Sequence, residues 1–343
     1  MRDSAGSSPV WVADESSWIR PRRRRRRMDN MYAVRAHSRG GPEQLVYEQA
    51  PRPEPGPGEV LVAVKAASIT PHELTWGATW THNDDGSGPE RTPIIPSHEF
   101  SGVVAACGAG VESPAEGDAV YGLIPFTRDG AAAEYVTLPA AVVAAKPTTV
   151  DHDQTAALPL AALTAWQALV DHAALQAGQH VLVQGGAGGV GNFVVQIAAA
   201  LGARVSATAS AADLEFVKGL GAEQVVDYAH DRFEDHVRDV DVVVDLVGGS
   251  TLSRSWSVLK PGGILVGIAA PPDQQEAAQH GARGVFFVVE PEQKALRSIA
   301  ELVDGGRLRP VVDRVLPLAE TRAGYEALET AKRRGKIVIH VAD

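Results

Sequence analysis

Short apolar runs alternate with turn residues over the first third of the chain that carries a folded pattern. The runs fall at residues 34–36, 59–67, 101–106 and 119–121, with clusters rich in proline, glycine and acidic residues at 51–58, 108–110 and 116–118. Short strands divided by such turns are typical of a small, barrel-like β domain. From Thr155 to Leu175 the apolar spacing becomes helical, so we expect a domain boundary near residue 150.

Strands and helices alternate in the next stretch of the sequence. Strands are expected at residues 180–184, 204–208, 224–226, 240–246, 263–268 and 285–289, and helices at 188–201, 212–220 and 250–259. After Pro291, helices at 292–303 and 319–330 and a strand at 336–341 complete the chain. Continuous apolar strands between helices indicate a parallel sheet covered on both faces, so the sequence predicts an α/β fold.

Composition narrows the class of protein. The 343 residues are 45% apolar and 22% charged, which is the balance of a soluble globular protein. No uninterrupted apolar run is long enough for a membrane span or a signal peptide, so we expect neither membrane insertion nor secretion. The single cysteine, Cys107, excludes an internal disulfide and any zinc site that needs two thiolates. A reducing, cytoplasmic location fits this count.

Charge divides unevenly along the chain. Residues 1–28 carry eight basic and three acidic groups, a net charge of +5, and the rest carries 24 basic and 39 acidic groups, a net charge of −15. A body this acidic repels nucleic acid. The arginine run at residues 22–27 could be a basic arm for an anionic surface, but without an amphipathic pattern we expect a disordered extension.

A glycine-rich turn joins the first strand of the second domain to its first helix. Residues 181–191 contain a G-x-G-x-x-G pattern, followed by apolar residues at helical spacing. The first glycine permits a tight turn, the second lets backbone approach a pyrophosphate, and the third lets the helix pack on the strand. We therefore expect a dinucleotide site that includes Gly186, Gly188, Gly189, Val190 and Gly191.

The end of the second strand of this sheet indicates which dinucleotide binds. A site for NAD normally has an acid about twenty residues beyond the first glycine, where it bonds the ribose 2′-OH. That place reads Thr208-Ala209-Ser210, with no acid. Ser210, Lys218 and Tyr228 offer two hydroxyls and an ammonium that could surround a 2′-phosphate, so we expect NADPH.

Motifs spread over the chain resemble those of one enzyme superfamily. Besides the glycine turn they are Pro96-Ser-His-Glu-Phe-Ser-Gly102, Ala161-Ala-Leu-Thr-Ala-Trp166, Lys218-Gly-Leu-Gly-Ala222, Val226-Asp-Tyr228 and Arg334-Gly-Lys-Ile-Val338. Over roughly residues 31–343 the sequence resembles the medium-chain dehydrogenase/reductase superfamily, and within it the zinc-independent quinone oxidoreductase branch.

The resemblance implies a domain layout with an active-site cleft between two domains. Residues 1–30 would be the disordered basic extension and residues 31–150 a GroES-like, β-rich catalytic domain. Residues 151–290 would be a Rossmann NADP-binding domain with a doubly wound parallel sheet. The C-terminal segment, residues 291–343, would complete the catalytic domain.

Zinc members of the superfamily hold the metal with an early cysteine, a histidine followed by glutamate, and a third ligand at the start of the nucleotide domain. His98 and Glu99 match the second element, but residues 69–74 and 158–161, at the other two places, contain no thiol. His72 and His98 with Glu73 or Glu99 could still form a weak site of nitrogen and oxygen ligands. We expect no metal, and expect His98 and Glu99 to hold loop backbone by hydrogen bonds.

The resemblance also implies cofactor contacts outside the glycine turn. Thr164 would lie near the nicotinamide, and Thr70, where quinone reductases commonly have asparagine, near its ribose. The same resemblance implies further contacts from Asp245, Val247, Phe287 and Lys336.

Four residues are expected to line the substrate site, namely Thr70, His72, Trp76 and Trp80. The two tryptophans could stack on a flat acceptor or pack in the core. Enoyl-thioester reductases of the superfamily place a tyrosine, their proton donor, in the corresponding loop, and residues 76–80 contain none. No catalytic side chain is therefore identified.

These expectations converge on an NADPH-dependent, zinc-independent reductase that transfers hydride to a quinone or an α,β-unsaturated carbonyl, acting as a homodimer. Without a metal, reduction of an acceptor that spreads negative charge itself is favoured over oxidation of simple alcohols. An enoyl-thioester or polyketide-tailoring reductase and a non-catalytic NADPH-binding sensor remain alternatives.

A chain that begins at Met28 should match the full chain in thermal stability and in NADPH-linked turnover at physiological salt. The folded pattern starts only at about Met31, and exposed ion pairs between the arginine run and the acidic body contribute at most about 1 kcal/mol. Calorimetry and a spectrophotometric assay compare the two chains. Loss of activity on truncation would make the extension a functional element.

Overall fold

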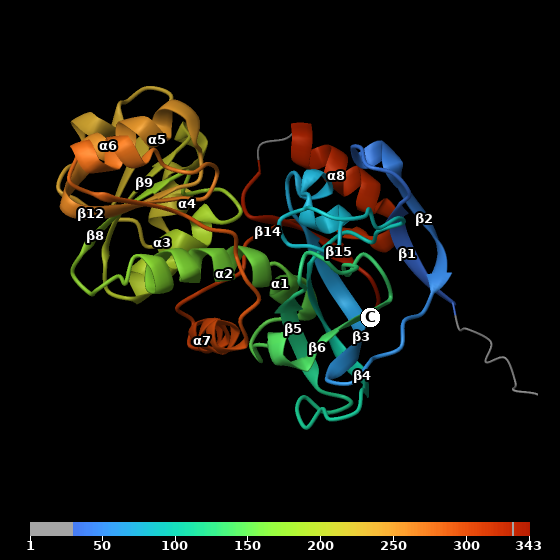
Figure 1. Ribbon diagram of the computed structural model, residues 1–343. Helices are drawn as coiled ribbons and strands as arrows, with labels where there is room; N and C mark the ends of the chain where they lie inside the picture. The colour runs from blue at the N-terminus through green and yellow to red at the C-terminus, as the bar shows by residue number, and fades with distance from the viewer. Residues whose placement is uncertain (1–29, 331–332) are drawn as a thin grey trace, which may run out of the picture.

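The computed structural model describes residues 30–330 and 333–343, which form two lobes (Figure 1). The predicted extension at residues 1–30 lies outside the described residues, apart from Asn30. One lobe is β-rich and combines the N-terminal part of the chain with its C-terminal end, and the other is built around a parallel sheet (Figure 1).

The β-rich lobe contains a seven-stranded sheet and a two-stranded ribbon. The sheet consists of β3 (Glu59–Ile69), β4 (Glu99–Cys107), β5 (Ala119–Leu123), β6 (Tyr135–Pro139), β7 (Val143–Ala145), β14 (Val312–Pro317) and β15 (Lys336–His340). Its order is β14-β15-β3-β4-β5-β7, with β6 also paired to β3. The ribbon pairs β1 (Asn30–Ala36) with β2 (Leu45–Pro51). The apolar faces of these strands, around Val62 and Phe100, enclose one core.

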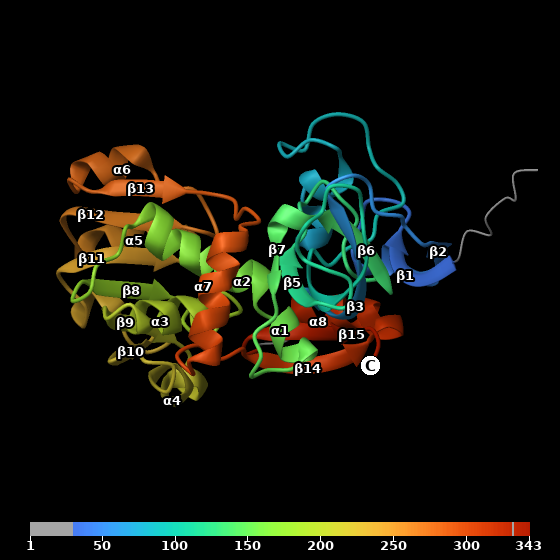
Figure 2. The same ribbon diagram turned by 90° about the horizontal axis from the view of Figure 1, so that it is seen from below.

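The second lobe is a doubly wound parallel sheet, as the sequence predicts. Its strands are β8 (His180–Gln184), β9 (Arg204–Ala209), β10 (Gln224–Asp227), β11 (Val240–Asp245), β12 (Leu259–Gly267) and β13 (Arg283–Phe286). They lie in the order β10-β9-β8-β11-β12-β13, which Figure 2 shows along the sheet. The order reverses between β8 and β11, where open α/β sheets bind ligands.

Helices cover both faces of this sheet. One apolar core joins it to α2 (Pro159–Trp166), α3 (Gly191–Ala200), α4 (Leu214–Lys218) and α7 (Gln293–Asp304). A separate core on the opposite face, which includes Leu182 and Trp256, holds α5 (Gly249–Ser255) and α6 (Gln274–Gln279). Burial on both faces explains the continuous apolar strands in the sequence.

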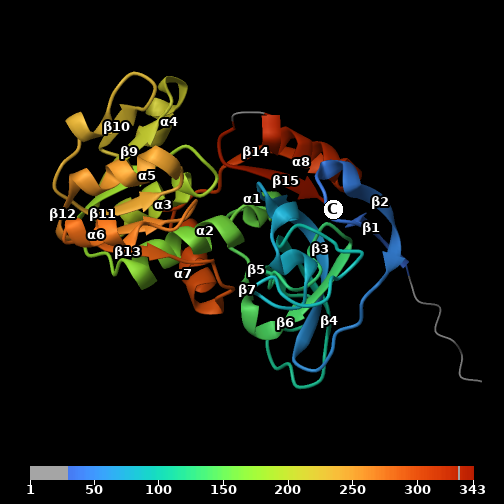
Figure 3. The same ribbon diagram turned by 45° about the horizontal axis from the view of Figure 1, so that its top comes forward.

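The C-terminal segment returns to the first lobe, because β14 and β15 join its sheet beside β3. Between them, α8 (Thr321–Thr330) lies beside the β1–β2 ribbon (Figure 3). A Cβ at Gly324 would lie 2.9 Å from the Ile69 side chain, so this glycine lets α8 approach β3 closely. The packing places the C-terminal residues against the end of β3.

The crossing between the lobes begins with α1 (His152–Ala156), which packs on β3 and β4 of the first lobe. Asp151 and Gln154 form a capping box that fixes its start. Ala156 and Ala157 are buried against Ala66 and Val338 of the first lobe, whereas Leu158 belongs to the core of the second. The helical spacing predicted from Thr155 to Leu175 is confirmed by α1, α2 and the π-helical segment at Gln167–His172.

Some predicted elements differ from the structure. The strand expected at residues 285–289 is instead β13, because parallel pairing with β12 runs from Arg283 to Phe286. The pattern also missed β2, β6, β7, β14 and α6, which are short or exposed on one side and lack a clear apolar period. Within the described part of the chain, no helix is both long and apolar enough to cross a bilayer.

Candidate functional site

A cleft of about 470 Å³ lies where the two lobes meet, at the carboxyl ends of β8 and β9. The first lobe contributes Ile69, Thr70, Pro71 and the residues before and within β15, and the second contributes the glycine turn and the ends of its strands. Of the residues predicted to hold cofactor or substrate, the following line it: Thr70, Gly188, Gly189, Val190, Gly191, Ser210, Tyr228 and Lys336.

The glycine turn lines one wall of the cleft, and its backbone geometry requires glycine at particular positions. Gly185 has φ +84°, in the left-handed region, and a Cβ at Gly191 would lie 2.1 Å from the Gly185 carbonyl oxygen. By contrast, the nearest atom to a Cβ built at Gly188 is 3.5 Å away. Gly191 thus lets α3 start against the strand, while Gly188 leaves open space beside the N-terminus of α3, which suits an anion.

Gly186 does not line the cleft, and its role in the turn comes from close packing against the neighbouring strand and helix. Its Cβ would meet Ala207 and Val217 at 3.0 and 3.1 Å, so it permits β8 to end close to β9 and α4. The Gly185 amide donates to the Thr208 hydroxyl at 3.0 Å, which fixes the turn to the end of β9.

Ser210, Asp213 and Tyr228 line one end of the cleft, beyond β9 and β10. The sequence reading that this end has no acid is wrong, because the short helical segment at Ala211–Asp213 brings the Asp213 carboxylate back beside Ser210. The Ser210 hydroxyl donates to Asp213 Oδ2 at 2.6 Å. The sequence shows this acid three residues beyond Ser210, but it does not show the short helical turn that brings the acid back to the end of β9.

Lys218 does not reach this end of the cleft, so its assignment as a cofactor contact is corrected. It lies at the exposed end of α4 and pairs with Glu215 at 2.8 Å. The cation near the ribose end is Arg334, whose Nε donates to Asp213 Oδ1 at 2.5 Å. Sequence reasoning missed both Arg334 and the cleft-lining Arg333, because contacts between residues more than 100 positions apart leave no local pattern.

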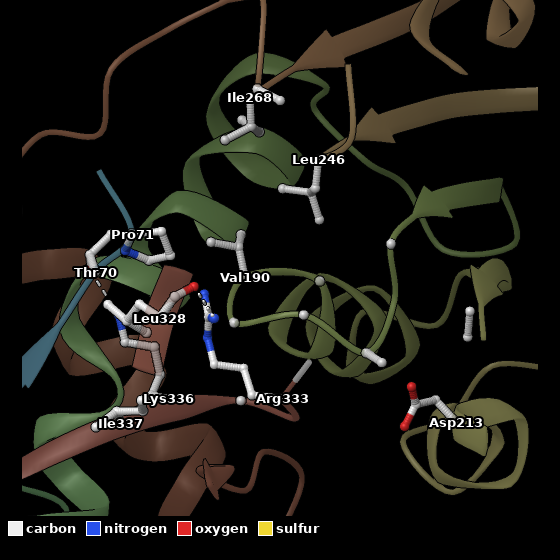
Figure 4. A pocket seen from close by; sticks show the side chains of 18 of the residues that line it. Thr70, Pro71, Val190, Asp213, Leu246, Ile268, Leu328, Arg333, Lys336 and Ile337 are labelled. Carbon is white, nitrogen blue, oxygen red and sulfur yellow. Dashed lines mark hydrogen bonds between the residues drawn. The ribbon is translucent and has the colours of Figure 1, made fainter. Parts of the chain in front are cut away.

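At the opposite end, Lys336 carries a buried ammonium into the cleft wall (Figure 4). Its Nζ lies 2.5 Å from Glu99 Oε1 and donates to the Thr70 hydroxyl at 2.8 Å. The other Glu99 oxygen accepts from the Leu160 amide at 2.9 Å, at the start of α2. Lys336 and Glu99 are only 5% and 1% exposed, so neither charge is stabilised by water and each depends on the other.

A second buried carboxylate, Glu73, holds the loop behind this wall. Its Oε1 accepts from the Ser97 and His98 amides and lies 2.5 Å from His98 Nδ1, and its Oε2 accepts from the Tyr325 hydroxyl at 2.7 Å. Burial raises the pKa of Glu73, but the hydrogen bonds from His98 and Tyr325 and the charge of Lys336 outweigh it, and the net shift is downward. Burial and the Glu73 charge raise the pKa of Tyr325, which keeps its proton as the donor.

These hydrogen bonds and ion pairs occupy the carboxylate and imidazole side chains that a zinc ion would need as ligands. Glu73 is saturated by His98, Tyr325 and backbone amides, and Glu99 is paired with an ammonium. In residues 30–330 and 333–343, no three His, Cys, Asp or Glu side chains converge as a metal site. The residues present therefore do not fit a zinc centre.

The aromatic residues predicted to line the acceptor site fall in two places. Trp80 is 1% exposed in the core of the first lobe, where its indole N–H donates to the Leu74 carbonyl, so its assignment as a substrate contact is wrong. Trp76 packs edge-on against Phe126, with ring centres 5.1 Å apart, and both contact an apolar core that runs from Tyr121 and Leu123 of the first lobe into the second. Trp76 is not among the cleft-lining residues, so its contact with an acceptor stays a prediction.

The other predicted contacts do not line the cleft. Thr164 is 4% exposed, and its hydroxyl donates to the Leu160 carbonyl. Asp245 is buried and accepts from the amides of the following turn, with a pKa that burial raises. Val247 is exposed, Phe287 packs against the His172 ring, and His72 is exposed beside the cleft-lining Pro71.

Comparisons with known proteins agree with this arrangement. Residues 56–148 match the alcohol dehydrogenase GroES-like domain family, and residues 220–339 match the zinc-binding dehydrogenase family. The quinone oxidoreductase from Coxiella burnetii superposes with a TM-score of 0.81 at 32% identity, over 91% of this chain and 100% of its own. These matches confirm the expected GroES-like domain joined to a Rossmann-like domain.

Sequence relatives are oxidoreductases. The zebrafish (Danio rerio) NAD(P)H oxidoreductase RTN4IP1, mitochondrial, is 32% identical, covering 84% of each chain. The tomato (Solanum lycopersicum) 2-methylene-furan-3-one reductase is 33% identical, covering 82% of this chain and 71% of its own. The Arabidopsis thaliana NADPH-dependent alkenal/one oxidoreductase, chloroplastic, is also 33% identical, covering 84% and 73%.

Replacing Glu73 by glutamine should lower the free energy of unfolding at pH 7 by about 1.5–3 kcal/mol, because a charged acceptor for buried donors is lost. Since the folded pKa of Glu73 is lowered, its stabilisation is present above the pKa of the unfolded chain, about 4.3, and disappears as pH falls through the folded value. Denaturant unfolding should therefore show a difference from wild type at pH 7 that narrows below about pH 4.

The control for this variant is Glu90→Gln, which removes an exposed carboxylate from its pair with Arg39. It should change the free energy of unfolding by less than about 1 kcal/mol. An equal effect of the two substitutions would contradict the role given to Glu73.

Proposed function

This chain belongs to the medium-chain dehydrogenase/reductase superfamily, on its quinone oxidoreductase-like side, and we propose that it is an NADPH-dependent, zinc-independent reductase of quinones or α,β-unsaturated carbonyls. It is an oxidoreductase that uses a nicotinamide cofactor. The observation that carries the finer proposal is the cleft itself, which joins a glycine turn at a helix N-terminus to a wall held by an ammonium instead of a metal.

The cleft fits a dinucleotide at three points. The space beside Gly188 and the N-terminus of α3 suit the pyrophosphate. Ser210 and Tyr228 stand at the ribose end, and Thr70 with Lys336 stands at the other end. When bound, the nicotinamide supplies a hydride.

Preference for NADPH is supported by a basic side chain at the ribose end. Arg334 stands at the edge of the cleft against Asp213, so one guanidinium group is close to where a 2′-phosphate would lie. Arg333 also lines the cleft, but its guanidinium donates to the Leu328 carbonyl and points away from Asp213 (Figure 4). Asp213 opposes this preference, and its charge is partly offset by Arg334. One relative carries the words NADPH-dependent in its name.

The wall of the cleft favours an acceptor that takes negative charge. The Lys336 ammonium is fixed beside Thr70 by Glu99, so the protein holds a positive charge there without reorganisation. A quinone or conjugated carbonyl spreads the charge that hydride delivers over its own oxygen. Water then protonates the oxygen of the reduced quinone, or the α carbon of the reduced conjugated carbonyl.

The domain boundaries and the cellular location of the protein are also proposals. The division at 31–150, 151–290 and 291–343 is supported by the return of β14 and β15 to the first sheet, although the contacts of α1 place the crossing nearer Ala157. A cytoplasmic location is proposed from the single cysteine. The names of some relatives include the words mitochondrial or chloroplastic.

The function is tested with an acceptor panel of a quinone, a 2-alkenal, an enoyl-thioester and a simple aldehyde, each with NADPH and NADH. We expect turnover with NADPH on the quinone or alkenal, a lower kcat/KM with NADH, and unchanged rates after dialysis against a chelator. Failure of all acceptors would refute the reductase proposal, a preference for the thioester would favour the tailoring enzymes, and activity lost with stoichiometric zinc would refute metal independence.

Dimerisation is expected through β13, the edge strand of the second sheet. Phe286 and Val288 are 45% and 63% exposed at this strand and just after it, and β13 ends the sheet in the described part of the chain. Left exposed, such an edge would invite aggregation. Pairing with a second copy across a two-fold axis buries both. Light scattering at micromolar concentration should report twice the 36.1 kDa chain mass, and Val288→Lys should give the monomer mass. A monomeric wild type would contradict the assignment.

A further inference from the structure

We propose that Asp213 and Arg334 act as a pair that sets the preference between NADPH and NADH, an inference that rests on the function proposed above. It deepens that function by assigning the discrimination to two residues whose side chains meet across the edge of the cleft.

The acid lies where a dinucleotide would place its adenosine ribose. Asp213 lines the cleft together with Ser210 and Tyr228, just beyond the carboxyl end of β9. The Asp213 amide donates to the Ser210 carbonyl at 2.8 Å, so the turn that carries the carboxylate is fixed by its own backbone. A carboxylate at this place accepts a hydrogen bond from a ribose 2′-OH and repels a 2′-phosphate.

The base comes from the other lobe. Arg334 immediately precedes Gly335 and β15, and it reaches the second lobe with two donors. Its Nε donates to Asp213 Oδ1 and its Nη2 donates to the Ala212 carbonyl, both at 2.5 Å. The guanidinium carbon also lies 5.2 Å from the centre of the Phe216 ring. Three contacts therefore hold one guanidinium against the acid.

The two charges have opposite effects on the cofactors. Asp213 alone would favour NADH, as the acid of an NAD site does. Arg334 partly offsets that charge and brings a planar donor fork that matches a phosphate. The side chains of Arg334 and Asp213 are 49% and 22% exposed, so a ligand in the cleft can exchange contacts with them without unfolding the site.

The pair is also suited to discrimination because it is not needed for folding. An ion pair this exposed contributes little to stability, in contrast to the buried pair of Lys336 and Glu99 at the other end of the cleft. Substitutions at Asp213 and Arg334 should therefore change cofactor binding in a protein that remains folded.

The test measures the dissociation constants of NADP⁺ and NAD⁺ by calorimetry in wild type, Arg334→Gln, Asp213→Asn and the double variant. We expect Arg334→Gln to weaken NADP⁺ by about ten- to a hundredfold with little change for NAD⁺. Asp213→Asn should tighten NADP⁺ and weaken NAD⁺, each about fivefold or more. The double variant should bind NADP⁺ more tightly than Arg334→Gln alone, because the uncompensated carboxylate is gone.

Matched controls come from α8, where Arg322 and Glu326 form an exposed pair at 2.8 Å outside the cleft lining. Arg322→Gln and Glu326→Gln make the same changes in net charge and should leave both dissociation constants unchanged. Thermal unfolding of all variants checks that each is folded.

The outcomes separate the inference from the function on which it rests. Suppose that wild type binds NADP⁺ or NAD⁺, but the ratio of the two dissociation constants is the same in the Asp213 and Arg334 variants as in wild type, or shifts equally in the α8 controls. The inference is then overturned, and the proposed function stands. Purely additive effects in the double variant would also overturn it, since the residues would not act as a pair. If wild type binds neither nucleotide, the proposed function falls as well.

Discussion

The buried ion pair of Lys336 and Glu99 is the contact on which the site depends. Removing two charges from water costs several kcal/mol each, so the pair persists only because every oxygen of Glu99 is occupied and the ammonium has two partners. The groups involved come from β4, β15, the start of α2 and Thr70, the residue that follows β3. One carboxylate thus joins the C-terminal strand to the first sheet and to the helix that leads into the second lobe.

The two ends of the cleft consequently have different physical characters. At the end near Thr70, the charges of Lys336 and Glu99 are buried and satisfied by each other, which fixes their side chains. The end at Asp213 and Arg334 is open to water, so its ion pair is weak and can rearrange around a ligand. Between them, the glycine turn supplies backbone rather than charge. A fixed arrangement of charges near Thr70 and an exposed, rearranging ion pair at Asp213 and Arg334 suit an enzyme whose cofactor must enter and leave the cleft.

Local sequence patterns predicted most of the parallel sheet and the glycine turn, because strand burial, helix spacing and the need for Gly191 are determined within a few residues. They could not predict β14 or the ribbon strand β2, whose exposed faces lack an apolar period. Lys218 was misplaced because its spacing along the chain suited the ribose end, whereas α4 directs it to solvent. Asp213 needed the return turn to be recognised, and Arg334 needed the tertiary contact of residues 121 positions apart.

The most direct measurement of the central claim follows the hydride itself. Zinc-free protein would be incubated with NADPH deuterated at the transferred position of nicotinamide C4 and with an α,β-unsaturated ketone, and the product would be examined by NMR and mass spectrometry. We predict one deuterium at the carbon β to the carbonyl and a proton from water at the α carbon. NADPH oxidation without deuterium in the ketone, or transfer only after zinc is added, would contradict the account.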